Sequence, residues 1–416
     1  MKNKLFWISK YFAVGLLIIT MSFAIGCSGS GNNRDPFANN EYNDDSNHSN
    51  GSNLSGVIAI IGGLLGNNGE ETPATREYVY VNNFVYESPN YVSAFSINTD
   101  GTLIELAGSP YATGGNGAGA SSSFAINTIA IAPTKRLLFA SNVMDSTITV
   151  FSINNNDGTL TIIGSPVSSG GSMGDGGTLV ANDNYLFVGN ASTNNISVFS
   201  MSDSGELTPV TGSPFYIGGA ADGMTLNLSG NILYVANPDN NTLITLNVAS
   251  NGSLSPIAGS PFAYTADSSQ ITSFALSSST IGIAADIDGF LSSYSIDAIG
   301  TPTLLNVLNT GVAESQCVTT ARNGSIAILS GGGRDRISVA NVAANGSLTQ
   351  VAGSPFATNT ITGGYAVANP EGTFLYATEE SQLEGFSIGA NGALTSLGTF
   401  PLTNAPAPSG IVIYAP

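Results

Sequence analysis

The stretch Asn251–Phe262 reads NGSLSPIAGSPF, and it decides the fold because the chain repeats it. Each copy combines a turn-forming pair, a short apolar segment and a Gly-Ser-Pro triplet. Four further copies follow this order: DGTLIELAGSPY at 100–111, DGTLTIIGSP at 157–166, SGELTPVTGSPF at 204–215 and NGSLTQVAGSPF at 345–356. Self-similarity at a fixed period is typical of a repeat architecture.

The spacing of the triplets indicates seven copies. Their glycines lie at positions 108, 164, 212, 259 and 353, and the last gap of 94 residues equals two steps of 47. The copy inside that gap is LLNVLNTG at 304–311, which keeps the apolar segment and lacks the triplet. The seventh copy is LTSLGTFPL at 394–402.

Each repeat contains four strand-like segments, named A to D in chain order. In the fourth repeat they are GMTLNLS (223–229), NILYVAN (231–237), TLITLNV (242–248) and SLSPIAG (253–259). Apolar residues alternating with polar ones, rich in β-branched types, predict strands rather than helices. Asp-Gly and Asn-Gly pairs supply the positive φ of a tight hairpin between C and D. The Ser-Pro dipeptide is expected to turn the chain from the outer strand D inward to the next repeat.

The two ends of the repeat region predict how a ring closes. The first repeat opens on a B strand, EYVYVNN (77–83), and the chain finishes on an orphan A strand, SGIVIYA (409–415). If the two join in one sheet, every repeat becomes a complete four-stranded blade and the ring has no open edge. The sequence therefore predicts an all-β fold, a seven-bladed β-propeller over 77–416 closed by the C-terminal strand.

Residues 1–26 have the pattern of a secretory signal peptide, because three lysines precede the apolar run Phe12–Gly26. The run AIGC that ends at Cys27 resembles the lipobox of bacterial lipoproteins, which predicts a lipid such as palmitate on this cysteine. Ser28 follows where an Asp would favour the inner membrane, so the resemblance implies a lipid-anchored protein of the cell envelope, at the outer membrane.

Residues 27–76 are polar and repetitive, and we expect them to form a disordered tether. The tether contains one apolar run, Leu54–Leu65, which is too short to span a bilayer. Docking on the propeller and insertion into the membrane interface remain alternatives for this run.

The charge of the chain is strongly acidic. Lys and Arg number 10 against 28 Asp and Glu, and removal of the three signal-peptide lysines leaves 7 against 28, a formal charge of −21. Such a surface repels nucleic acid and anionic headgroups, which disfavours polyanion binding. Apart from Cys27 the only cysteine is Cys317, expected to be a small buried residue on an inner strand.

With these motifs identified, the chain resembles the lactonase-like seven-bladed propellers and the related YVTN-repeat propellers. The resemblance rests on YVYVNN (78–83), LYVANPDNNTLITLNV (233–248) and the recurrent GSPF, and it extends over 77–416. The family includes 6-phosphogluconolactonases as well as secreted propellers without a known reaction. The repeats therefore indicate the architecture, whereas activity depends on a site.

The residues of the propeller exclude several kinds of active site. The single histidine, His48, lies in the tether, so a Ser-His triad or a His metal site is excluded. The His, Arg and acid constellation that the resemblance implies for lactonases has no His to carry it here. Only five cations remain for a phosphosugar, namely Lys135, Arg136, Arg322, Arg334 and Arg336.

Acidic residues are predicted to gather at one mouth of the central channel. Four of them directly precede A strands, and B-to-C loops on the same side add further acids and Arg334; the four are Asp175, Asp222, Asp267 and Glu314. Three interpretations stay open: each acid caps its own turn, the group binds Ca²⁺ or another ligand, or one carboxylate, Asp222 or Glu314, activates water.

The function favoured by the sequence is an envelope lipoprotein whose monomeric propeller binds a protein or glycan partner and catalyses no reaction. No motif demands a cofactor, and Ca²⁺ is the one metal that the acids would suit. The alternative is a lactonase-like hydrolase that uses carboxylates at the central channel.

Overall fold

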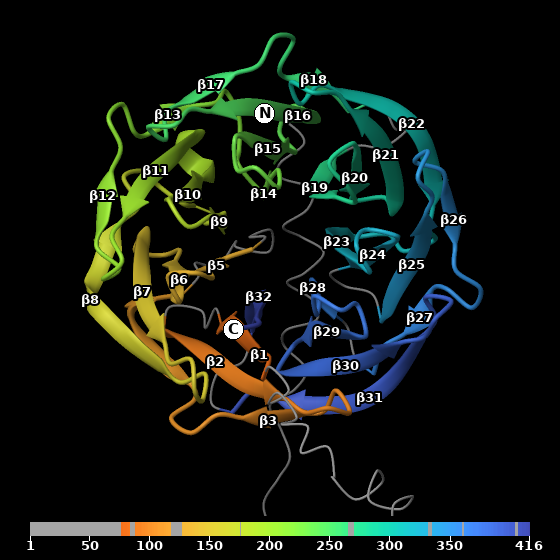
Figure 1. The fold of residues 1–416 in the computed structure, drawn as a ribbon, viewed down its shortest axis with the longest axis horizontal. Helices are drawn as coiled ribbons and strands as arrows, with labels where there is room; N and C mark the ends of the chain where they lie inside the picture. The colour runs from red at the N-terminus through yellow and green to blue at the C-terminus, as the bar shows by residue number, and fades with distance from the viewer. Residues whose placement is uncertain are drawn as a thin grey trace, which may run out of the picture. The chain divides into compact units, whose positions relative to one another are not determined.

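The computed structural model describes residues 76–83, 88–117, 127–174, 176–264, 270–331, 335–359, 362–403 and 407–416. These residues form seven antiparallel sheets that surround a central channel (Figure 1). The predicted seven-bladed β-propeller is confirmed. The predictions for the signal peptide, Cys27 and Leu54–Leu65 fall outside the described residues. In the described part, no helix has the length and apolarity needed to cross a membrane.

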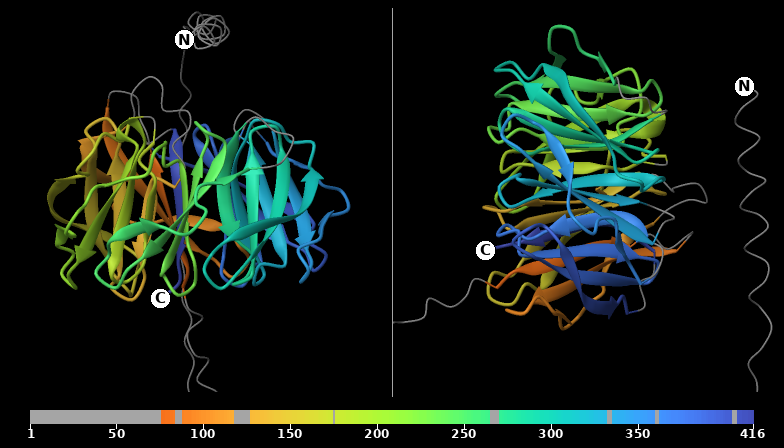
Figure 2. Two further views of the ribbon diagram at one scale, coloured as in Figure 1. Left: turned by 90° about the horizontal axis from the view of Figure 1, so that it is seen from above. Right: turned by 90° about the vertical axis from the view of Figure 1, so that its right-hand side faces the viewer.

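Each blade runs from an inner strand A to an outer strand D, and Figure 2 shows the strands crossing the thickness of the ring. The first blade contains β32 (Pro408–Tyr414), β1 (Tyr78–Asn83), β2 (Pro89–Ile97), β3 (Leu103–Glu105) and β4 (Tyr111–Asn116), and the second contains β5 (Ile129–Ala132), β6 (Leu137–Asn142), β7 (Thr147–Ile153) and β8 (Leu160–Ser168). The third blade contains β9 (Leu179–Ala181), β10 (Tyr185–Asn190), β11 (Asn195–Met201), β12 (Leu207–Pro209) and β13 (Phe215–Tyr216), with the 3₁₀ turn η1 (Ala191–Thr193). The fourth blade contains β14 (Gly223–Leu226), β15 (Ile232–Asn237), β16 (Thr242–Val248), β17 (Leu254–Pro256) and β18 (Phe262–Ala263). The fifth blade contains β19 (Ile271–Leu276), β20 (Ile281–Asp286), β21 (Phe290–Ile296) and β22 (Pro302–Asn309). The sixth contains β23 (Ser315–Ala321), β24 (Ile326–Gly331), β25 (Arg336–Val342), β26 (Leu348–Gln350) and β27 (Phe356–Ala357). The seventh contains β28 (Thr362–Ala368), β29 (Phe374–Glu379), β30 (Gln382–Ile388) and β31 (Leu394–Pro401).

The ring closes as predicted, with the last strand completing the first blade. β32 pairs antiparallel with β1, from Tyr78 opposite Tyr414 to Asn83 opposite Pro408. The hydroxyl of Ser409 donates to the carbonyl of Asn82 at 3.1 Å and lies 2.8 Å from the hydroxyl of Thr128 in the second blade. The C-terminal strand thus pairs with the first strand of the repeat region and also contacts the second blade.

The apolar residues are distributed among the blade interfaces rather than gathered in one centre. The described residues form seven buried clusters, and each lies mainly between two neighbouring blades. One example joins Phe187 and Val198 of the third blade to Leu233 and Leu246 of the fourth. Burial of apolar surface is the main favourable term in folding, so each blade depends on its neighbours for stability.

The glycine of the C-to-D turn fastens each blade to the one before it. Gly158 has a φ of +72° and lies against the ring of Tyr78, where a Cβ atom would approach to 2.3 Å. Its carbonyl accepts a hydrogen bond of 2.7 Å from the Tyr80 hydroxyl. Gly101 closes the ring in the same way, because its carbonyl accepts from Tyr376 of the seventh blade at 2.8 Å.

The expectation that Ser-Pro turns the chain inward is wrong for four blades, because the outer strand resumes after the triplet. β17 and β18 both pair with β16, at its two ends. Between them, the hydroxyl of Ser260 accepts the backbone N–H of Thr245 at 2.9 Å. The same bond recurs at 2.9–3.0 Å from Ala94 to Ser109, Val198 to Ser213 and Val339 to Ser354. The serine therefore replaces a ladder bond where strand D is interrupted.

Candidate functional site

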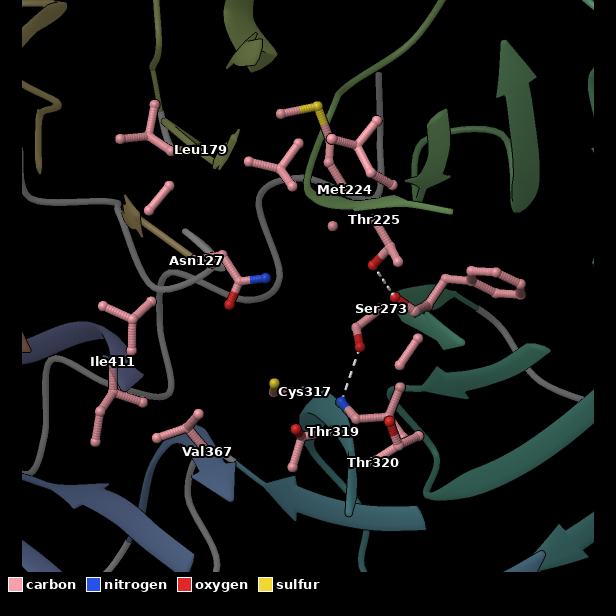
Figure 3. Close-up of a pocket in the computed structure, with 18 of the residues that line it drawn as sticks. Asn127, Leu179, Met224, Thr225, Ser273, Cys317, Thr319, Thr320, Val367 and Ile411 are labelled. Carbon is pink, nitrogen blue, oxygen red and sulfur yellow. Dashed lines mark hydrogen bonds between the residues drawn. The ribbon is translucent and has the colours of Figure 1, made fainter. Parts of the chain in front are cut away.

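A cavity of about 510 Å³ occupies the centre of the ring and is the candidate site (Figure 3). Its lining comes from the inner strands β5, β9, β14, β19, β23, β28 and β32. The lining combines apolar side chains such as Leu179 and Met224 with the hydroxyls of Thr225 and Thr319. None of the described residues that line the cavity has a charged side chain.

Hydrogen bonds fix the polar wall of the cavity. The hydroxyl of Thr225 donates to the carbonyl of Phe274 at 2.5 Å, and that of Ser273 accepts the N–H of Val318 at 2.8 Å. These bonds connect neighbouring inner strands, β14 to β19 and β19 to β23. The wall is rigid because side chains bridge strands that share no backbone ladder.

Two of the predicted acids stand at the same end of their inner strands. Asp222 directly precedes β14 and Glu314 directly precedes β23, and both are half-buried. Asp175, Asp267 and Arg334 lie outside the described residues. Where the structure describes the chain, no three His, Cys, Asp or Glu side chains gather closely enough to hold a metal. The calcium site stays a prediction, because two of its four acids, Asp175 and Asp267, lie outside the described residues.

A buried tyrosine lies near Asp222. Tyr365 on β28 is only 5% exposed. Burial raises the pKa of its hydroxyl well above the usual range, and the nearby Cys317 and Asp222 raise it further. The hydroxyl therefore keeps its proton at neutral pH. Sequence reasoning missed Tyr365; an aromatic residue in the A strand TGGYAVA was the available signal.

Cys317 is a small buried residue on the inner strand β23, as expected. Burial raises the pKa of its thiol to about 11. The thiol is therefore protonated at neutral pH and unsuited to nucleophilic chemistry, because the thiolate is the reactive form.

Two of the acids at the B-to-C connections accept hydrogen bonds from described residues. Asp145 accepts the backbone and side-chain N–H groups of Asn116 at 2.6 and 3.1 Å. Asp286 accepts the N–H of Asp288 and of Phe290, each at 3.0 Å, and the hydroxyl of Tyr264 at 2.8 Å. Asp286 therefore fits the turn-capping interpretation, whereas Asp145 bonds a residue of the first blade and joins the first two blades.

The seventh blade contains a buried pair of carboxyl groups that sequence reasoning recognised only in part. Glu379 ends β29, and Glu384 is the third residue of β30, where other C strands have a buried hydroxyl (Thr149, Ser197, Ser292, Ser338). Glu384 accepts bonds of 2.7–2.8 Å from the backbone and side-chain N–H of Asn359 and from the hydroxyl of Ser396. Burial raises the pKa of Glu384, and the neighbouring Glu379 contributes to the increase.

Two of the five cations have structural partners away from the cavity lining. Arg322 donates to the carbonyls of Gly372, Ala390 and Ile388 at 3.1, 2.9 and 2.6 Å, and so joins the sixth blade to the seventh. Lys135 pairs with Asp203. Neither cation is placed to receive a phosphate in the channel.

Comparison with known proteins supports a lactonase-like propeller. Residues 73–222 match the family model described as lactonase, seven-bladed β-propeller. The structure superposes on the periplasmic gluconolactonase of Pseudomonas aeruginosa with a TM-score of 0.67 at 16% identity, covering 82% of this chain and 100% of that one. A candidate 6-phosphogluconolactonase from Bacteroides uniformis gives 0.67 at 15% identity, with coverages of 82% and 99%. A Lactobacillus plantarum protein gives 0.63 at 14% identity, with coverages of 81% and 99%. No curated protein matches the sequence.

Proposed function

We propose that the protein hydrolyses uncharged lactones at the Asp222 end of its central channel. The charge pattern carries the proposal: among the described residues the cavity lining has no charged side chain, and Asp222 and Glu314 directly precede two of its inner strands. A phosphorylated substrate would approach these carboxylates and find no cation among the described lining residues, whereas an uncharged cyclic ester meets no such barrier. The lactonase-like comparisons favour this alternative over a binding module.

The chemistry requires a base, a donor and a water molecule. The carboxylate of Asp222 accepts a proton from water while the water oxygen attacks the lactone carbonyl. The candidate hydrogen-bond donor to the developing oxyanion is the hydroxyl of Tyr365. This hydroxyl remains protonated because burial and the nearby Asp222 raise its pKa. The ring C–O bond then breaks, the proton passes from Asp222 to the leaving alkoxide, and a hydroxy acid forms. Its carboxylate is repelled by the acidic mouth, which favours release.

The test is the rate of ring opening of an uncharged aldonolactone and of its phosphorylated counterpart, each corrected for spontaneous hydrolysis. We expect turnover of the uncharged substrate, unaffected by EDTA and reduced about 10²–10⁴-fold in Asp222→Asn, the range for loss of a general base. Asp239→Asn is the matched control, because Asp239 is an exposed acid in the same blade and the charge change is equal. Preference for the phosphorylated substrate, or equal rates for the two variants, would refute the proposal.

We further propose that a lipid on Cys27 holds the propeller at the outer membrane. The support is the lipobox-like AIGC after an apolar run, followed by Ser28. The propeller would then bind its substrate in the cell envelope, outside the inner membrane.

A further inference from the structure

The inner strands carry a ring of mainly apolar side chains at the end opposite Asp222 and Glu314. The pairing register defines this apolar ring: in each blade, its member is the inner-strand residue that lies opposite the second residue of strand B. From the first blade to the seventh, the members are Ile413, Ile131, Ala181, Leu226, Leu276, Thr320 and Ala368. Six are apolar, and the sixth blade alone has a hydroxyl at this position.

The apolar ring belongs to the wall of the central cavity. All of its members are half-buried, and all except Ala368 line the cavity, where the neighbouring Val367 takes its place. Leu228, in the turn that follows β14, also lines the cavity and is 90% exposed. Covering such side chains with an apolar group removes their surface from water, which is favourable. This end of the channel is therefore suited to an apolar part of a ligand.

The channel thus differs in chemistry between its two ends. Asp222 directly precedes β14 and Leu226 ends it, so four steps of extended chain separate the two residues by about 13 Å. Thr320 has the one hydroxyl of the ring, and this hydroxyl donates to the carbonyl of Leu276 at 3.1 Å. The hydroxyl of Thr225 is engaged in the same way with Phe274 (Figure 3). A polyhydroxylated ligand needs a hydrogen-bond partner for each buried hydroxyl, whereas an alkyl chain needs none.

We propose that the preferred substrates are lactones whose ring carries a linear alkyl chain. The lactone ring lies at the Asp222 end, and the chain extends across the apolar ring. The reverse orientation would place the lactone carbonyl among apolar side chains, which costs desolvation without a hydrogen bond in return. This inference rests on the proposed lactone hydrolysis and names its substrate class. The reaction is unchanged: water adds to the carbonyl carbon, the ring C–O bond breaks, and a hydroxy acid with the alkyl chain is released.

Hydrolysis of γ-lactones with linear alkyl chains of increasing length tests the inference. Each methylene buried at the apolar ring should raise kcat/KM about fourfold, because burial of a CH₂ group is favourable by that factor. Relative to spontaneous ring opening, the longer members should be better substrates than an uncharged aldonolactone. A kcat/KM that does not depend on chain length would overturn the inference and leave the proposed hydrolysis intact.

A double substitution in the apolar ring tests where the chain binds. Leu226→Thr with Leu276→Thr should reduce the gain per methylene to about twofold or less, and Thr320 shows that the fold accepts threonine at this register. Leu254→Thr is the matched control, because Leu254 lies on the outer strand β17 and packs against the same buried cluster as Leu226. Equal loss of the chain-length gain in the two variants would contradict the assignment. Leu228→Thr replaces the double variant if circular dichroism shows that the latter does not fold.

Binding of alkyl γ-lactams separates the ligand class from the reaction, because their amide ring resists opening. In isothermal titration calorimetry, their affinity should rise about fourfold per buried methylene and lose most of this rise in the double variant. Affinity that is independent of chain length would overturn the inference. Chain-length-dependent lactam binding without hydrolysis of any lactone would instead refute the proposed hydrolysis and support the inferred ligand class.

Discussion

Replacing Ser213 by alanine measures how much the serine of the repeated triplet contributes to the stability of the fold. Val198 is fully buried in β11. Its backbone N–H and carbonyl form hydrogen bonds with the segment that interrupts strand D of the third blade. Its N–H donates to the Ser213 hydroxyl at 2.9 Å, and its carbonyl accepts the N–H of Val210 at 2.9 Å. Alanine keeps the shape of the turn and removes the acceptor, so the N–H of Val198 loses its partner without a steric change.

The expected cost follows from the burial of that N–H group. A buried donor left without an acceptor costs about 1–3 kcal/mol. The matched control is Ser165→Ala in β8, which has the same Gly-Ser-Pro letters in a continuous strand. The Ser165 side chain is exposed, and a surface substitution of this kind changes stability by about 0.5 kcal/mol or less.

Two measurements check the prediction. In urea unfolding, Ser213→Ala should lower the midpoint at an unchanged slope, and Ser165→Ala should not. In native-state hydrogen exchange, the amide of Val198 should exchange about 5- to 150-fold faster in Ser213→Ala, the ratio equivalent to 1–3 kcal/mol. If both variants lose equal stability, or if Val198 stays protected, the serine does not act as the missing ladder acceptor.

Three further predictions concern the ring, the buried carboxyl pair and the anchor. Deleting Ser409–Pro416 should cause aggregation or a large loss of thermal stability, because β1 loses its partner strand; a truncated chain that melts like the full one would exclude this closure. Glu384→Gln should stabilise the fold at pH 7. The pKa of Glu384 is raised by burial and by Glu379, so its contribution is fully present below the unfolded pKa and is lost as pH rises through the folded pKa. The gain in melting temperature should accordingly vanish below about pH 4, where the carboxyl is protonated in both states; a gain that is independent of pH would contradict this. Cys27→Ala should move the protein from the detergent phase to the aqueous phase, and retention would assign the anchor to another segment.

Most of the architecture could be predicted from the sequence, because it depends on local spacing. The hairpin pairs such as Asn251-Gly252 require positive φ, and the orphan strand at 409–415 has one place to pair. The path of strand D could not be predicted in the same way. Its interruption depends on a hydroxyl meeting an N–H fifteen residues away, as Ser260 meets Thr245, and no period reveals that bond.

The candidate site was predicted less completely. Asp222 and Glu314 were found because they stand directly before A strands, a position that the repeat defines. Tyr365 was missed because its role depends on burial and on a carboxylate from another blade. Glu384 was missed although aligning the C strands would have shown a carboxylate where other blades place a hydroxyl.

The ring-opening rate of an uncharged aldonolactone, compared between the parent chain and its Asp222→Asn and Asp239→Asn variants, tests the central claim most directly. The account predicts enzymatic turnover that Asp239→Asn retains and Asp222→Asn reduces by about 10²-fold or more. No turnover above the spontaneous rate, or an equal effect of the two substitutions, would contradict it.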